Sequence, residues 1–153
     1  MIYSKVVFLL LFTSLLLLGG CFENHQSPQI DIQKPYAFAT IAGARTGAAF
    51  MQIQNNTDID HALIDAHSDI AEITEIHQNI IDPDDGMMMM RKIKQINIPA
   101  KEQINLEPKG YHIMFIGLNR PLIIGESISV SLTFEHGIKV TIPVHIIAPG
   151  TIP

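Results

Sequence analysis

Short runs in which apolar and polar residues alternate, each closed by turn-forming residues, constrain the fold of this chain more than any other feature. In one such run, Phe50 and Gln52 fall on one face of an extended strand, and Met51 and Ile53 fall on the other. The same reasoning predicts strands at 48–54, 62–67, 71–78, 87–93, 95–98, 103–106, 111–117, 127–134 and 138–147. Turn residues separate them at 82–86, 108–110, 119–121 and 135–137. Short, evenly spaced strands predict an all-β domain, an antiparallel sandwich or barrel.

The N-terminal segment has the features of an export signal. Lys5 precedes an apolar run at residues 6–18, and about 13 helical residues are too short for a bilayer core of roughly 30 Å. The run ends in Leu18-Gly19-Gly20-Cys21, which resembles the lipobox of bacterial lipoproteins, in which the cysteine is acylated. The alternative is an ordinary signal peptide followed by an incidental cysteine.

This interpretation divides the chain into four parts. We expect a signal peptide at 1–20, a lipidated Cys21 with a flexible polar tether at 21–35, a folded domain at 36–147 and a short tail at 148–153. The protein would then be a membrane-anchored lipoprotein of the periplasm.

Composition excludes several classes of function. The formal net charge is −5 and there is no basic tract, which argues against a nucleic-acid partner. A single cysteine cannot form a disulfide within the chain, a thiolate zinc finger or an iron–sulfur cluster. The sequence also contains no G-x-S-x-G elbow, H-E-x-x-H motif or phosphate loop, so nothing in it indicates an enzyme.

Methionine is concentrated in the run Met87-Met88-Met89-Met90. Methionine often fills gaps in a core, but adjacent side chains of a strand point to opposite faces. One pair, either Met88 with Met90 or Met87 with Met89, must therefore lie outward or line a site. The hairpin through 82–86 would return this run beside His77. His77 is expected to end its own strand.

The segment 111–115 adds a second histidine and another methionine. Tyr111, Ile113 and Phe115 form its apolar face, so His112 and Met114 share the opposite face, with Cα atoms about 6.7 Å apart. At that separation an imidazole and a thioether can converge on one ion. In the strand before His77, by contrast, Ile73 and Ile76 are expected to pack in the core.

Two imidazoles and two thioethers form an uncharged, soft to borderline donor set. Such a set prefers Cu(I) to Mg²⁺, Ca²⁺ or Zn²⁺. Outside the cytoplasm thiols tend to oxidise, whereas a thioether stays a usable ligand under mild oxidation. An exported carrier could therefore hold copper without cysteine. A blue-copper electron carrier is not expected, because its site needs a thiolate.

The segments 75–77, 90–91, 106–114 and 117–137 resemble the PCuAC family of periplasmic copper chaperones, whose ligand pattern is H(M)-x10-M-x21-H-x-M. The resemblance spans residues 46–146, and 21 residues separate Met90 from His112. It implies a single-domain, cupredoxin-like Greek-key β-sandwich that binds one Cu(I) through His77, Met90, His112 and Met114. It also implies delivery of copper to the binuclear copper site of cytochrome c oxidase, through an oxidase subunit or assembly factor.

Two features depart from the family pattern. Twelve residues separate His77 from Met90 instead of ten, which a longer turn at 82–86 would explain, and Met88 satisfies the shorter spacing and is the alternative ligand. The tail at 148–153 has neither histidine nor methionine, so a second copper site there is not expected.

Other metal-binding residue types have structural interpretations. Asp82, Asp84 and Asp85 are expected to form a solvated turn, because they lack the ligand spacing of a calcium loop. The remaining histidines are not expected in the main site: His25, His61, His67, His136 and His145. Two other functions remain open, a lipoprotein that sequesters copper for tolerance with the same ligands, and a structural sandwich without metal.

Overall fold

The structure is a computed structural model, and it describes residues 28–84 and 86–151. Within these residues the secondary structure is almost entirely β, with one 3₁₀ turn, η2, at Glu135–Gly137. The strands are β1 (Ile30–Phe38), β2 (Thr46–Asn55), β3 (His61–His67), β4 (Ala71–Ile81), β5 (Met88–Lys92), β6 (Ile96–Ile98), β7 (Gln103–Leu106), β8 (Tyr111–Leu118), β9 (Ser127–Phe134) and β10 (Lys139–Ile147). The all-β prediction is confirmed.

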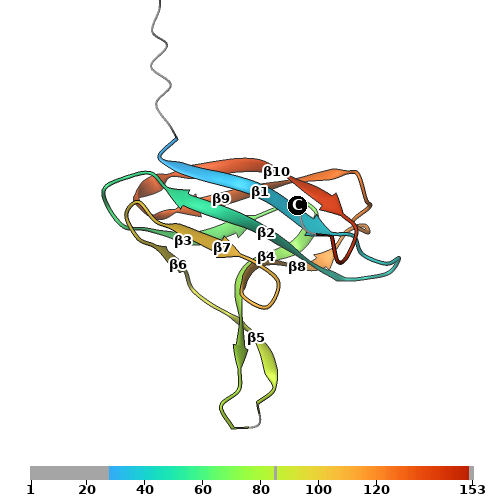
Figure 1. Ribbon diagram of the computed structural model, residues 1–153. Helices are drawn as coiled ribbons and strands as arrows, with labels where there is room; N and C mark the ends of the chain where they lie inside the picture. The colour runs from blue at the N-terminus through green and yellow to red at the C-terminus, as the bar shows by residue number, and fades with distance from the viewer. Residues whose placement is uncertain (1–27, 85, 152–153) are drawn as a thin grey trace, which may run out of the picture.

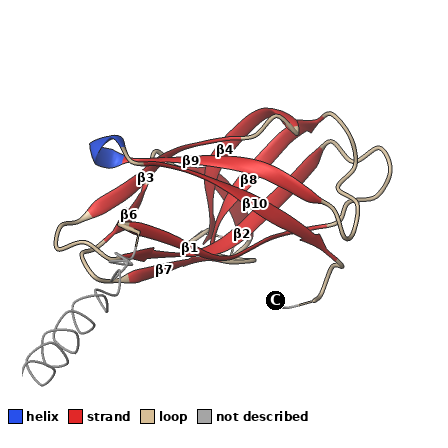
Figure 2. Cartoon of the chain, turned by 90° about the horizontal axis from the view of Figure 1, so that it is seen from above, coloured by secondary structure: helices blue, strands red, loops and turns tan. Residues whose placement is uncertain are grey.

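The strands join edge to edge in the order β5-β4-β8-β7-β2-β1-β10-β9-β3-β6, and β8 also pairs with β2. The sheet folds over so that its two halves face one another (Figures 1 and 2). Most neighbours are antiparallel, but β1 runs parallel to β10 and β7 runs parallel to β8. Phe115 of one half and Phe134 of the other are both fully enclosed in the core between the halves. Burying a side chain of this size contributes roughly 1.5–3 kcal/mol.

Strand β1 is not among the strands predicted from the sequence. It begins at Ile30, so residues 30–35 of the expected tether at 21–35 belong to a strand, and the folded domain starts six residues before the expected boundary at 36. Pro35 suggested a linker, but it lies where the pairing of β1 with β2 slips, after Lys34 at a φ of 48°. A bulge accommodates proline because no ladder hydrogen bond is required of it there. The expected signal peptide, Cys21 and the start of the tether lie outside the described residues.

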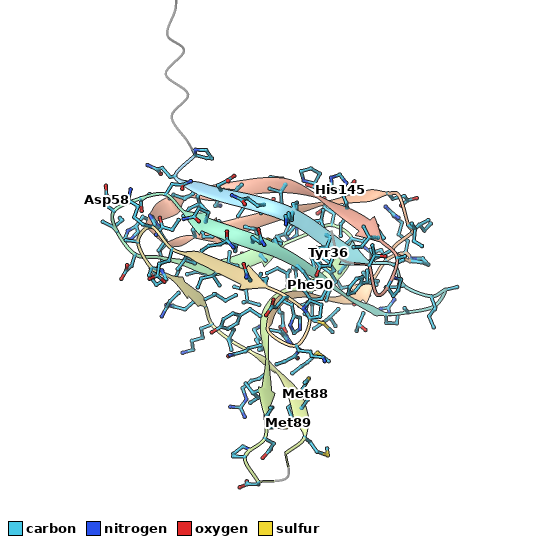
Figure 3. All side chains as sticks on the ribbon, viewed as in Figure 1. Tyr36, Phe50, Asp58, Met88, Met89 and His145 are labelled. Carbon is cyan, nitrogen blue, oxygen red and sulfur yellow. The ribbon has the colours of Figure 1, made fainter. Side chains whose placement is uncertain are left out.

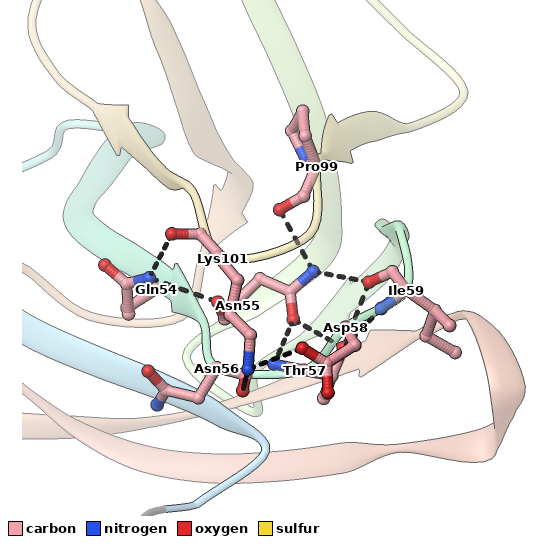
Figure 4. Close-up of polar contacts among 8 residues, drawn as sticks. All are labelled: Gln54, Asn55, Asn56, Thr57, Asp58, Ile59, Pro99 and Lys101. Atoms are coloured by element: carbon pink, nitrogen blue, oxygen red, sulfur yellow. Dashed lines mark hydrogen bonds and ion pairs between the residues drawn. The ribbon is translucent and has the colours of Figure 1, made fainter.

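A buried asparagine ties two loops together at one end of the sandwich (Figure 4). Asn55 is fully buried at the end of β2, and its side-chain amide donates to the backbone carbonyls of Ile59, Ile98 and Pro99 at 2.8–3.1 Å. Its side-chain oxygen accepts hydrogen bonds from both the backbone amide and the hydroxyl of Thr57. Each polar atom of this buried side chain is therefore satisfied.

The β4–β5 hairpin projects away from the body of the molecule (Figure 1). Strand β4 continues to Ile81, past His77, so the expectation that His77 ends its strand is wrong. Ile76 is buried as expected, but Ile73 is 50% exposed, because it lies on the outer face of β4. Among the described residues, no helix is long and apolar enough to cross a membrane.

Candidate metal centre

Strands β4, β8 and β5 place the predicted ligands on one outer face of the sheet. His77 of β4 lies directly opposite His112 of β8, and their ring centroids are 5.8 Å apart. On the other side of β4, Met90 of β5 lies opposite Asn79, which is two residues along the same face from His77. Met114 lies two residues from His112 on the same face of β8. The four predicted ligands, which are far apart in the sequence, therefore lie on the same face of three adjacent strands.

The residues of the predicted apolar face of β8 are buried or partly buried, but His112 on the other face is buried as well, with only 3% of its surface exposed. Ile113 and Phe115 are fully enclosed in the core, and Tyr111 packs against it from the edge. His112 and Met114 therefore point to the opposite face, as the sequence indicated. Their strand is held from both sides, by β4 and by β2.

A hollow of about 360 Å³ opens on this face. Met90, His112 and Met114 line it, and Phe38 and Phe50 contribute aromatic walls. Phe50 lies at the base of the projecting hairpin (Figure 3), with its ring centroid 6.3 Å from that of His112. Apolar walls around neutral donors lower the local polarity, which favours a soft ion over a strongly hydrated one.

Glu75 determines which ring nitrogen of a neutral His77 carries the proton. The Glu75 carboxylate accepts a hydrogen bond from His77 Nε2 at 2.8 Å and binds Lys92 Nζ at 2.7 Å. Because a carboxylate only accepts, the proton of a neutral His77 is on Nε2 and the lone pair is on Nδ1. Nδ1 is buried and has no hydrogen-bond partner. The same two contacts hold the pKa of Glu75 below its usual value.

In His112 the nitrogen with the available lone pair is Nε2, whereas in His77 it is Nδ1. The Nδ1 of His112 donates to the carbonyl of Gly110 at 3.2 Å, which leaves the lone pair on Nε2. Burial lowers the pKa of His112, and the nearby His77 lowers it further, although the bond to Gly110 opposes the shift. The imidazole is therefore held neutral at pH 7, the form that can bind a metal.

The register of the hairpin distinguishes Met90 from Met88. Both lie on the face of His77, but Met88 pairs with Ile81 and so lies one further step towards the tip. Their side chains are exposed, as are those of Met87 and Met89 on the reverse face, so neither pair packs in the core. Met88 and Met89 lie well out on the projecting hairpin (Figure 3).

The acidic turn is built from its own hydrogen bonds. Asp82 Oδ1 accepts from the backbone amide of Asp84, and the Asp82 carbonyl accepts from the amide of Gly86. Across residues 28–84 and 86–151, no three His, Cys, Asp or Glu side chains are placed to hold one ion.

The other described histidines lie away from the hollow. His67 bonds to Asp69 on the surface, and His145 contacts the hydroxyl of Ser127. His61 and His136 lie against each other at another edge of the sandwich. His25 lies outside the described residues.

Sequence reasoning did not identify Glu75 or Asn79 as residues of this face. The pattern Glu75-Ile76-His77 contains the signal, because residues two apart share a strand face. Asn79 lines the hollow beside Met90, and its side-chain oxygen is buried without a partner. Its position could not be predicted, because His77 was expected to end the strand.

Comparison with known proteins identifies the family of this chain and relates its fold to solved structures. The chain belongs to the family named LpqE-like lipoproteins, whose model matches residues 30–146. A relative named as lipoprotein Lxx21020, from Leifsonia xyli subsp. xyli (strain CTCB07), is 33% identical over 107 residues. That match covers 69% of this chain and 63% of the relative, less than two thirds of its length.

Solved structures show the same fold. The copper-bound PCuAC domain from PmoF2 superposes with a TM-score of 0.67 at 22% identity, covering 82% of this chain and 97% of that domain. The apo PCuAC domain from PmoF1 gives 0.67 at 21% identity, over 82% of this chain and 98% of that domain. The solution structure of CuI-DR1885 from Deinococcus radiodurans gives 0.65 at 23%, over 84% and 85%. The expected cupredoxin-like fold of PCuAC domains is confirmed.

Proposed function

We propose that this protein is a Cu(I)-binding metallochaperone whose ligands are His77, Met90, His112 and Met114. The observation that carries the proposal is the pair of facing imidazoles, each with one ring nitrogen bonded within the chain. Nδ1 of His77 is buried without a partner, and the bond to Gly110 leaves the lone pair of His112 on Nε2. Two thioethers lie on the same face. The copper-bound state of the PmoF2 domain and the Cu(I) state of DR1885, both of the same fold, support copper as the cargo.

The donor set favours the monovalent ion. Neutral imidazole and thioether ligands suit Cu(I), and binding is expected to be weaker than to thiolates, which helps release. Met90 is 63% exposed, so a partner's ligands can reach the ion from the hairpin side. Accessibility of this kind suits transfer of the ion more than electron transfer or permanent storage.

The destination and the anchor are further parts of the proposal. The resemblance to the PCuAC family suggests that the acceptor is the binuclear copper site of cytochrome c oxidase. The names of the family and of the relative from Leifsonia xyli support a lipoprotein, with Cys21 as the acylated residue. We infer a periplasmic domain held to a membrane by this lipid.

An anaerobic competition titration with a Cu(I) chelator tests the site. The full chain carries Cys21→Ser so that no thiol competes, and one Cu(I) per monomer is expected. His112→Ala and Met114→Ala should each weaken binding by about a hundredfold, equivalent to about 2.7 kcal/mol. His67→Asn, which removes an exposed histidine outside this face, is the control and should bind like the parent, and equal losses in all three variants would count against the assigned ligands.

Delivery and anchoring have separate tests. Incubating the Cu(I)-loaded protein with the apo copper domain of an oxidase should move copper to that domain, whereas copper retained under these conditions would favour sequestration. Cys21→Ser should shift the protein from the membrane to the soluble fraction. Radiolabelled lipid that still attached to this variant would refute the anchor.

A further inference from the structure

A second pair of histidines lies outside the face described above. His61 is the first residue of β3 and His136 lies in the turn η2, and their rings meet edge to face with centroids 5.2 Å apart. Neither residue lines the hollow around His112. The pair therefore needs its own explanation.

His61 is buried in a way that leaves both ring nitrogens unsatisfied. The residue is 3% exposed, and neither Nδ1 nor Nε2 has a hydrogen-bond partner. A neutral imidazole carries one N–H donor and one lone pair, and leaving either unmet in a folded protein costs about 1–3 kcal/mol. Its neighbours across and along the strand, Ile98 and Leu63, are fully buried apolar residues that cannot supply a partner.

His136 closes this buried ring from the solvent side. It is exposed and has a φ of 60°, a left-handed conformation in which histidine is enriched several-fold among non-glycine residues. The turn between β9 and β10 thus places one accessible imidazole directly against an enclosed one.

We propose that His61 and His136 form a second metal site, which takes a divalent transition ion with Cu(II) ahead of Zn(II). Two nitrogens bound to one ion at about 2.0–2.1 Å lie at most about 4.2 Å apart, a span that rings 5.2 Å apart can meet. The pair offers imidazole without thioether, and imidazole sites bind Cu²⁺ more tightly than Zn²⁺.

The site would have two protein ligands. No third His, Cys, Asp or Glu joins this pair in the described part of the chain, so water completes the coordination. Affinity should therefore be lower than at a site with four protein ligands. This inference is independent of the proposed Cu(I) function, because the two sites share no residue.

Titration of the full chain carrying Cys21→Ser, followed by NMR of the histidine side chains, tests the inference. Zn²⁺ should shift the ring signals of His61 and His136, and substoichiometric Cu²⁺ should broaden the same signals. His136→Asn, which keeps a residue that tolerates positive φ, should lower affinity for both ions at least tenfold. His67→Asn removes an exposed histidine from the other end of β3 and should leave it unchanged.

Two results would overturn the second site. One is His136→Asn binding Zn²⁺ and Cu²⁺ as tightly as the parent. The other is broadening confined to His77 and His112, which would assign divalent copper to the main face. Because His136→Asn should retain Cu(I) in the chelator titration, loss of the second site and failure of the chaperone proposal are distinguishable.

Discussion

Asn55 in the core and His77 on the outer face of β4 both have buried polar atoms, but these atoms are used differently. Every polar atom of the Asn55 side chain is bonded to the loops around it, whereas His77 bonds through Nε2 and leaves Nδ1 buried and unpaired. Folding alone favours the first arrangement, because an unmet buried polar atom is a cost. The difference indicates that Asn55 serves stability, and that Nδ1 of His77 is kept for a ligand from outside the chain.

The largest expected effect is the loss of stability on replacing Asn55, whose polar atoms are all bonded. Asn55→Leu leaves carbonyls of two loops without donors, so the free energy of unfolding should fall by about 3 kcal/mol or more. Urea unfolding measures it, with Asn56→Leu as the neighbouring control, since the Asn56 side chain makes only an exposed contact with the carbonyl of Pro28. Equal losses in the two variants would remove the contrast with His77.

His77→Leu should show the opposite pattern. Cu(I) affinity should fall by at least tenfold, about 1.4 kcal/mol, because one ligand is lost. The free energy of unfolding should change by less than about 1 kcal/mol, because the substitution also removes an unpaired buried nitrogen. Chelator competition and urea unfolding on the same sample separate the two quantities, and a large loss of stability with intact affinity would reverse our assignment.

The hairpin register makes a prediction about the two candidate thioethers. Met90→Leu should weaken Cu(I) binding by about tenfold, whereas Met88→Leu should change it less than threefold, because Met88 pairs with Ile81, further from His77. Met89→Leu, on the reverse face, provides the baseline. A larger loss for Met88 than for Met90 would show that the family spacing, and not the pairing of β5, identifies the ligand.

Glu75→Gln should have a smaller effect on affinity, within the range of a few-fold to tenfold. The amide oxygen can still accept from His77 Nε2, but the negative charge that binds Lys92 is lost. Nitrogen NMR of the His77 ring should show that the apo parent carries its proton on Nε2 and that the variant mixes both tautomers. An unchanged tautomer with unchanged affinity would limit Glu75 to a structural ion pair.

The smallest expected effect is on pH dependence. The pKa of His112 is lowered in the folded protein, so the unfolded chain takes up a proton first as the pH falls. Its contribution to stability is therefore complete above about pH 6.5 and is lost below it, with a slope of at most about 1.4 kcal/mol per pH unit. Urea unfolding at pH 7.5 and 5.5 should show a smaller difference in His112→Gln than in the parent.

Alternation predicted most of the fold, because a strand with one face in the core must alternate. The prediction from alternation failed where a strand is interrupted by a bulge or has no face in the core. Strand β1 contains Pro35 at a bulge, which resembles a linker in sequence. The end of β4 leaves the body of the molecule, so Gln78 to Ile81 have no core face to pattern.

The candidate site was only partly predictable. The shared face of His112 and Met114 follows from the apolar neighbours within the same strand, and both residues line the same hollow. Which nitrogen each histidine leaves free depends on Glu75 and on the carbonyl of Gly110, contacts that exist only once the strands pair. Similarly, the meeting of His61 with His136 depends on a turn that lies far from β3 in sequence.

The start of β1 and the tip of the β4–β5 hairpin lie at opposite poles of the molecule (Figure 1). If the domain is attached through Ile30, the hairpin end, which carries the methionines, therefore points away from the point of attachment. If the chain is held from its N-terminal side, a docking molecule can approach that pole without colliding with the supporting surface. The distance between the poles would then act as a spacer built into the domain itself.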